Sequence, residues 1–116
     1  MGGILRNSLG EIHIAKEALA TIAGRASVEC YGIVGMASKR ATDGIIELLG
    51  KENLSRGVKV HTRGNEVDID IYIIVEYGVS IPTVAKNVMD RIRYNVEKFS
   101  GMEVKNVNIK VEGVRV

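Results

Sequence analysis

The chain has 116 residues, of which 46% are hydrophobic and 26% charged. This length and composition fit one globular domain with a core of its own. Its 16 basic and 14 acidic residues leave a formal net charge of +2, whereas a dedicated nucleic-acid-binding module usually shows a larger basic excess. The start, MGGILRNSLGEIHI, lacks the apolar stretch of a signal peptide, and no apolar run approaches the roughly 20 residues that span a bilayer. We therefore expect a cytoplasmic protein.

The first half of the chain predicts a strand, a helix and a second strand. Residues 11–14 alternate between polar and apolar side chains, as a short strand does. From Ala15 to about Cys30 the apolar residues recur at helical spacing and are mostly small, which predicts a helix lying close to its neighbour. Residues 33–37 then predict a buried strand. Residues 38–44 have the composition of a loop, and residues 45–49 predict a short turn or helix.

A β-hairpin follows, and its turn fixes the pairing of its strands. Gly64 and Asn65 form a two-residue turn signal between two alternating runs. With a two-residue loop, three pairs of oppositely charged side chains face one another on one side of the hairpin: Arg63 and Glu66, His61 and Asp68, Lys59 and Asp70. Each cross-strand pair stabilises the hairpin by roughly 0.2–1 kcal/mol, and the opposite side is apolar. A slip of one residue would turn the charged side chains toward the core.

The last part of the chain predicts a long amphipathic helix and a returning strand. Ser80 is suited to cap the helix, which continues to about Ser100, and Gly101 is suited to end it. Its apolar stripe, expected to face the core, consists of Ile81, Val84, Ala85, Val88, Ile92, Val96 and Phe99. The final strand alternates, with Val107, Ile109 and Val111 facing inward.

The predicted fold class is α+β. The elements follow the order β-α-β-(short helical insertion)-β-β-α-β and form a two-layer sandwich, with the helices on one face of a mixed sheet. Residues 1–9 are expected to be a flexible N-terminal segment, and residues 10–116 a single α+β domain.

Two groups of side chains could carry metal or acid–base chemistry. Asp68 and Asp70 project to the same face of a strand, but each has a predicted basic partner, which favours a salt-paired surface. A metal site made of Glu11, His13, His61 and Asp68 would need the first strand to lie beside the hairpin, and the spacing matches no zinc or iron signature. We expect no catalytic residue, no metal and no cofactor.

Cys30 and the segment Gly32–Gly35 have structural interpretations that compete with functional ones. Cys30 falls at the C-terminal end of a helix, which does not lower the pKa of a thiol, so we interpret it as a small hydrophobic packing residue. The GIVG segment has the spacing of an RNA-binding KH loop. Such a loop joins two helices, however, and here the segment borders an apolar strand. The polar sheet face offers one aromatic residue, Tyr72, where an RNA-binding platform uses two or three.

An ordered series of motifs resembles the alkaline-shock-protein family, the envelope stress response proteins of Gram-positive and related bacteria. The motifs are GEIHI, AGRA, YGIVGMAS, GVKV (Gly57–Val60), VEYG (Val75–Gly78), SIPTVA (Ser80–Ala85) and NVNIKVEGV (Asn106–Val114). The resemblance covers about residues 10–114. It implies a small cytoplasmic protein that acts in alkaline or envelope stress and, in some relatives, is held near the membrane by a separate anchor protein. It brings no catalytic residues with it.

These observations favour a non-enzymatic interaction or scaffold protein that self-associates or docks on a protein partner, which could itself be anchored in the membrane. A small RNA-binding α+β module is the alternative. The expected interaction surface consists of Lys59, His61, Arg63, Asp68, Asp70, Tyr72, Lys86, Arg91 and Arg93.

Overall fold

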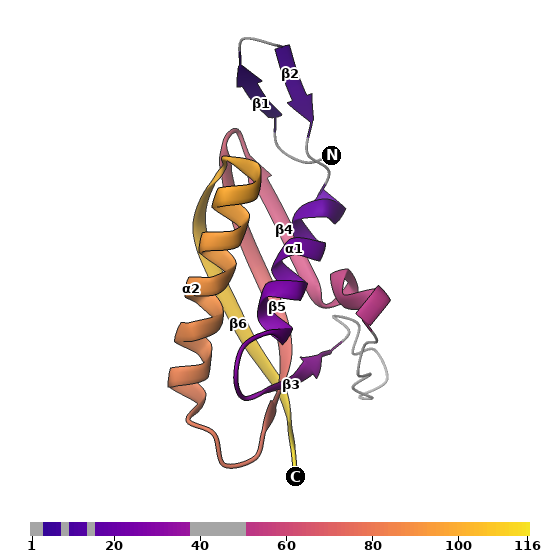
Figure 1. Cartoon of the computed structure of the whole chain (residues 1–116), viewed down its shortest axis with the longest axis vertical. Helices are drawn as coiled ribbons and strands as arrows, with labels where there is room; N and C mark the ends of the chain where they lie inside the picture. The colour runs from indigo at the N-terminus through magenta and orange to yellow at the C-terminus, as the bar shows by residue number, and fades with distance from the viewer. Residues whose placement is uncertain (1–3, 8–9, 14–15, 38–50) are drawn as a thin grey trace.

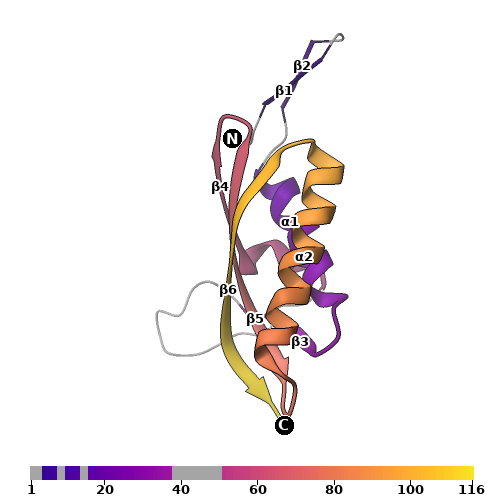
Figure 2. The same cartoon turned by 90° about the vertical axis from the view of Figure 1, so that its left-hand side faces the viewer.

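Within the described residues, two α-helices pack on one face of a four-stranded sheet, and Figures 1 and 2 show this layered arrangement. The computed structural model describes residues 4–7, 10–13, 16–37 and 51–116. Helix α1 spans Lys16–Val28 and helix α2 spans Ile81–Ser100, and they run in opposite directions along the sheet (Figure 1). The predicted two-layer α+β sandwich is confirmed.

Strand β5 (Glu66–Glu76) is the centre of the sheet. Strand β6 (Glu103–Arg115) runs parallel to it along one whole edge. The other edge is shared by two antiparallel strands, β4 (Val58–Arg63) beside the first part of β5 and β3 (Ile33–Met36) beside its last part. The sheet is therefore mixed, as expected.

The β4–β5 hairpin has the predicted register. Arg63 lies opposite Glu66, His61 opposite Asp68, and Lys59 opposite Asp70. Gly64 in the turn has φ +61°, a left-handed conformation that glycine adopts without the steric cost of a Cβ. The alternate residues Val67, Ile69, Ile71, Ile73 and Val75 are buried under the helices, so the hairpin turns its apolar side to the core.

Helix α2 begins and ends where the sequence predicts. Ser80 is the N-cap residue, although its hydroxyl donates to Thr83 Oγ1 at 3.0 Å and accepts no capping hydrogen bond from a backbone N–H of the first turn. Gly101 has φ +74° and its N–H donates to the carbonyl of Glu97 at 2.9 Å, which satisfies one of the free carbonyls at a helix end. Two members of the predicted stripe are wrong as core residues, because Ile81 is 41% exposed and Phe99 is 78% exposed.

The N-terminal residues form a separate hairpin of β1 (Ile4–Asn7) and β2 (Gly10–His13). It lies beyond one end of the sandwich, near the start of α1 (Figures 1 and 2). Strand β1 falls inside the segment expected to be loose. Strand β2 corresponds to the first predicted strand, but it pairs with β1 and belongs to its own two-stranded sheet.

A short 3-10 helix, η1 (Lys51–Gly57), precedes β4 and packs against α1. A Cβ at Gly24 of α1 would lie 3.0 Å from Leu54 Cβ, so the small side chains of α1 permit the close approach that the sequence predicts. The loop expected over residues 38–44 and the turn or helix expected over residues 45–49 lie outside the described residues.

Candidate interaction surfaces

The outer face of the sheet gathers six of the nine residues predicted to form an interaction surface. Lys59, His61 and Arg63 come from β4, and Asp68, Asp70 and Tyr72 come from β5. They alternate with buried residues, or with half-buried Thr62 in the case of Arg63, so they lie on the face opposite the helices. Strand β6 adds Asn106, Asn108 and Lys110, which pair in register with Asp68, Asp70 and Tyr72.

The two aspartates take their partners from β6 and not from β4. Asn106 Nδ2 donates to Asp68 Oδ1 at 3.0 Å, and Asn108 Nδ2 donates to Asp70 Oδ1 at 2.7 Å. Of the three predicted charge pairs, the described residues form only Arg63–Glu66, at 4.0 Å. The register is right but the expected ion pairs of Asp68 and Asp70 are wrong, because parallel β6 places an amide donor directly beside each carboxylate.

A metal site is not assembled in the part of the chain that the structure describes. There, no three His, Cys, Asp or Glu residues lie close enough together to hold a metal ion. The arrangement of Glu11, His13, His61 and Asp68 required the first strand to lie beside the hairpin, and β2 pairs with β1 instead.

The three basic residues predicted on α2 do not share one face. Lys86 is exposed and its Nζ lies 3.0 Å from Asp90 Oδ2. Arg91 points toward α1, where its Nη1 lies 3.8 Å from Glu29 Oε1. Arg93 is half-buried on the side of β6, and its Nε donates to the carbonyl of Val104 at 3.4 Å. They therefore provide no single basic surface.

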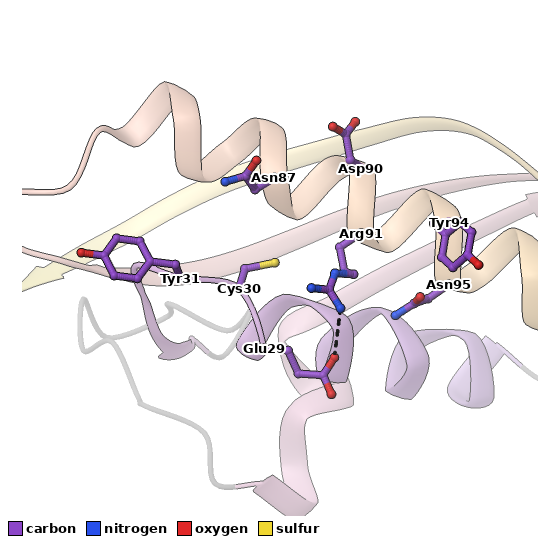
Figure 3. Close-up of a pocket in the computed structure, with 8 residues that line it drawn as sticks. All are labelled: Glu29, Cys30, Tyr31, Asn87, Asp90, Arg91, Tyr94 and Asn95. Carbon is purple, nitrogen blue, oxygen red and sulfur yellow. Dashed lines mark ion pairs between the residues drawn. The ribbon is translucent and has the colours of Figure 1, made fainter.

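The helical layer carries a groove that the sequence interpretation missed. Two adjoining hollows lie beside α2, one against the residues that directly follow α1 and the other against α1 itself. They share Glu29, Tyr94 and Asn95, and together we call them the helical groove. The first, drawn in Figure 3, has a volume of about 460 Å³ and is lined by Glu29, Cys30, Tyr31, Asn87, Asp90, Arg91, Tyr94 and Asn95. The second has a volume of about 610 Å³ and is lined by Ile22, Arg25, Ala26, Glu29, Tyr94, Asn95, Lys98 and Phe99.

Exposed aromatic side chains mark this groove. The chain has five aromatic residues, four tyrosines and one phenylalanine, and none of them is part of the buried core. Tyr31, Tyr94 and Phe99 line the helical groove with exposed fractions of 80%, 60% and 78%, and Tyr77, at 71%, lines a neighbouring hollow that shares Tyr31 and Asn87. Aromatic residues are enriched in protein–protein interfaces, and exposed apolar patches mark interaction sites.

The charges of the groove are partly paired across the two helices. The Arg91–Glu29 ion pair, dashed in Figure 3, joins α2 to the end of α1. Lys98 Nζ lies 5.5 Å from the centroid of the Tyr94 ring, within the range of a cation–π contact.

Cys30 lines the first hollow and is buried. Its side chain is 8% exposed and Sγ donates to the carbonyl of Ala26 at 3.4 Å. Burial raises the pKa of the thiol above its ordinary value; the positive charge of Arg91 opposes this and the negative charge of Glu29 adds to it. A raised pKa keeps the thiolate scarce at neutral pH, in agreement with the sequence interpretation of Cys30 as a small packing residue.

The groove was missed because it depends on how α1 and α2 pack. Phe99 continues the apolar period of α2, so it was assigned to the core. The signal that could have found the groove is the distribution of aromatic residues. Tyr94 lies three residues after Arg91, and Phe99 lies four residues after Asn95, so each shares a face of the helix with another groove residue. None of the aromatic residues of the chain falls at a core-facing position of a strand.

Comparison with known proteins identifies relatives along nearly the whole chain. Residues 5–116 match the ASP23 family, which is described as having a cell envelope-related function. The uncharacterized protein YloU of Bacillus subtilis is 52% identical over 97% of this chain and 94% of its own. YqhY of the same organism, also uncharacterized, is 37% identical over 92% and 78%. A stress response regulator gls24 homolog of Streptococcus pyogenes is 23% identical over 91% of this chain and 59% of its own.

Solved structures show the same fold at low sequence identity. The copper form of the MamM CTD aligns with a TM-score of 0.52 and 12% identity, covering 86% of this chain and 87% of that domain. The H264A-E289A variant of the same domain also gives a TM-score of 0.52. In the described part of this chain, neither helix combines the length and apolar character needed to cross a membrane.

Proposed function

The chain belongs to the ASP23 (alkaline-shock-protein) family of cell envelope-related function, and from this premise we propose that it is a non-enzymatic interaction protein that docks a protein partner in its helical groove. The docked partner would be the route by which the chain takes part in the envelope stress response.

One observation carries the proposal: all aromatic residues of the chain lie outside the core, and three of the five line one groove. A fully buried Phe side chain stabilises a fold by about 1.5–3 kcal/mol, yet Phe99 is 78% exposed. The fold itself gains little from an exposed aromatic, whereas a partner that covers it gains a large apolar contact. The groove is also concave, with hollows of about 460 and 610 Å³.

The chemistry of the groove supports binding and not catalysis. A cysteine nucleophile needs a thiolate and a neighbouring base, while the pKa of Cys30 is raised by burial and the residues lining its hollow include no histidine. The ionic groups Arg91 and Glu29 are engaged with each other at 3.8 Å. We therefore propose that the protein has no enzymatic activity.

The RNA-binding alternative has less support in the geometry. Gly32 has φ +88°, and a Cβ there would meet Val84 Cγ2 at 2.8 Å, so this glycine is explained by close packing against α2. The GIVG segment leads into strand β3 instead of joining two helices. On the sheet face, Tyr72 is the one aromatic residue, and its ring lies 5.5 Å from Lys110 Nζ.

The proposal is tested by comparing proteins captured from cells that express tagged variants at the native level. We expect the double variant Tyr94→Ala/Phe99→Ala to lose the partner of the wild-type chain. The variant Tyr72→Ala, which removes an aromatic ring from the opposite face, keeps it. Circular dichroism verifies that each variant is folded. Equal recovery of the partner with the groove variant, together with its loss in Tyr72→Ala, would assign docking to the sheet face instead.

A further inference from the structure

We propose, on the basis of the docking function above, that the occupant of the helical groove is an acidic amphipathic helix of a protein partner. Its apolar stripe faces the second hollow, and its Asp or Glu residues flank that stripe. Three features of the groove lead to this occupant: an apolar floor, two cations at its rim, and the direction of the two helices that form it.

The floor of the second hollow is apolar. Ala26 is 1% exposed and Ile22 is half-buried on the α1 side, while Phe99 and Tyr94 stand exposed on the α2 side. Ile22 and Ala26 lie four residues apart on α1, and Tyr94 and Phe99 lie five residues, about 7.5 Å, apart along α2, so an apolar strip follows the axes of the two helices. A strip between two helices is the surface on which a third helix lays residues spaced at i, i+3, i+4 and i+7.

After the existing ion pairs are set aside, the charged side chains that remain around the second hollow are positive. Glu29 pairs with Arg91 at 3.8 Å, and Asp90 pairs with Lys86 at 3.0 Å. Lys98 and Arg25 then remain at the rim of the second hollow. Within the described residues, neither forms an ion pair, so they are available to carboxylates of a partner.

The same charges argue against a second copy of the chain as the occupant. Two such grooves placed face to face would bring two Arg25 and two Lys98 side chains together, while the carboxylate that lines the second hollow in each copy, Glu29, is already paired with Arg91. Like charges across an interface oppose association. A helix with acidic residues on both sides of its apolar stripe meets the two cations and covers Phe99 in one arrangement.

Photo-cross-linking followed by binding measurements tests the proposal. The cross-linker p-benzoylphenylalanine replaces Phe99 in cells, and the cross-linked segment of the partner is sequenced. That segment is then synthesised with a fluorophore, and fluorescence anisotropy gives its Kd for the wild-type chain and for the variants Arg25→Glu, Lys98→Glu and Lys59→Glu. Lys59→Glu is the matched control, because it makes the same charge change on the sheet face.

We expect a segment with net negative charge and apolar residues at helical spacing. Each reversal in the groove raises its Kd roughly three- to tenfold, Lys59→Glu leaves it unchanged, and added salt weakens binding. Three results would overturn this occupant while leaving docking in the groove intact. They are a cross-link to a second copy of the chain, a cross-linked segment that is basic or extended, and a Kd that neither Arg25→Glu nor Lys98→Glu changes. If no protein is cross-linked from position 99, the docking function itself is overturned.

Discussion

The exposure of Phe99 makes a quantitative prediction about stability. Phe99 is 78% exposed, whereas Ile92, seven residues earlier on the same helix, is fully buried. About a fifth of the Phe99 side chain is covered, so its burial contributes roughly 0.3–0.6 kcal/mol of the 1.5–3 kcal/mol of a fully buried phenylalanine. The better helix propensity of alanine offsets about 0.5 kcal/mol. We expect Phe99→Ala to change the free energy of unfolding by less than about 0.5 kcal/mol.

The variant Ile92→Ala is the matched comparison, because it deletes a side chain from the core of the same helix. Its expected loss is about 2–5 kcal/mol, the range for buried Ile-to-Ala replacements. Urea denaturation followed by circular dichroism measures both changes from the midpoint at a common slope. A loss above about 2 kcal/mol for Phe99→Ala would mean that Phe99 is packed in solution, and would remove it from any interaction surface.

Three further predictions concern the backbone, the sheet face and the thiol. Gly32→Ala should destabilise the chain more than Gly64→Ala. Both glycines have a positive φ, which costs about 1–2 kcal/mol for alanine, but only a Cβ at Gly32 would also clash, with Val84 Cγ2. Equal losses of stability for the two variants in chemical denaturation would contradict the close contact. A double-mutant cycle of Asp68→Ala and Asn106→Ala should give a coupling energy of about 0.5–1 kcal/mol, and a value near zero would show that their hydrogen bond adds nothing to stability. Burial raises the pKa of Cys30, and iodoacetamide reacts with the thiolate. The pH at which the rate of alkylation increases should therefore be higher for the folded chain than for the chain unfolded in urea. The stability linked to this thiol is complete below its unfolded pKa and is lost as pH rises through the folded pKa; matching alkylation profiles would contradict the burial effect.

Local chemistry made the hairpin and α2 predictable from the sequence. The Gly64–Asn65 turn and the alternation around it determine the register of β4 against β5 without any distant contact. The end of α2 at Gly101 likewise follows from the preference of glycine for a left-handed conformation after a helix. In both places, the information lies within a few positions of the feature it predicts.

Long-range packing explains what the sequence interpretation missed. The partner of Asp68 is Asn106, 38 positions away, and depends on the register of a parallel strand, which no turn specifies. The period of α2 gives the direction of Phe99 but not whether another element covers it. The residues of α1 that line the same hollow as Phe99 include Ile22 and Ala26, and they do not cover Phe99, which stays on the surface. The groove therefore depends on how the two helices pack together.

Occupation of the helical groove in living cells is the central claim, and cysteine labelling tests it most directly. In a Cys30→Ala background, single cysteines are introduced by Asn95→Cys in the groove and Lys110→Cys on the sheet face, and the rate of labelling by N-ethylmaleimide is compared between cells and the purified chain. Asn95 lines both hollows, and its replacement leaves the aromatic and basic residues of the groove in place. We predict that position 95 is protected several-fold in cells while position 110 labels at the same rate in both. Equal labelling of position 95 in cells and in isolation would contradict a partner docked in this groove.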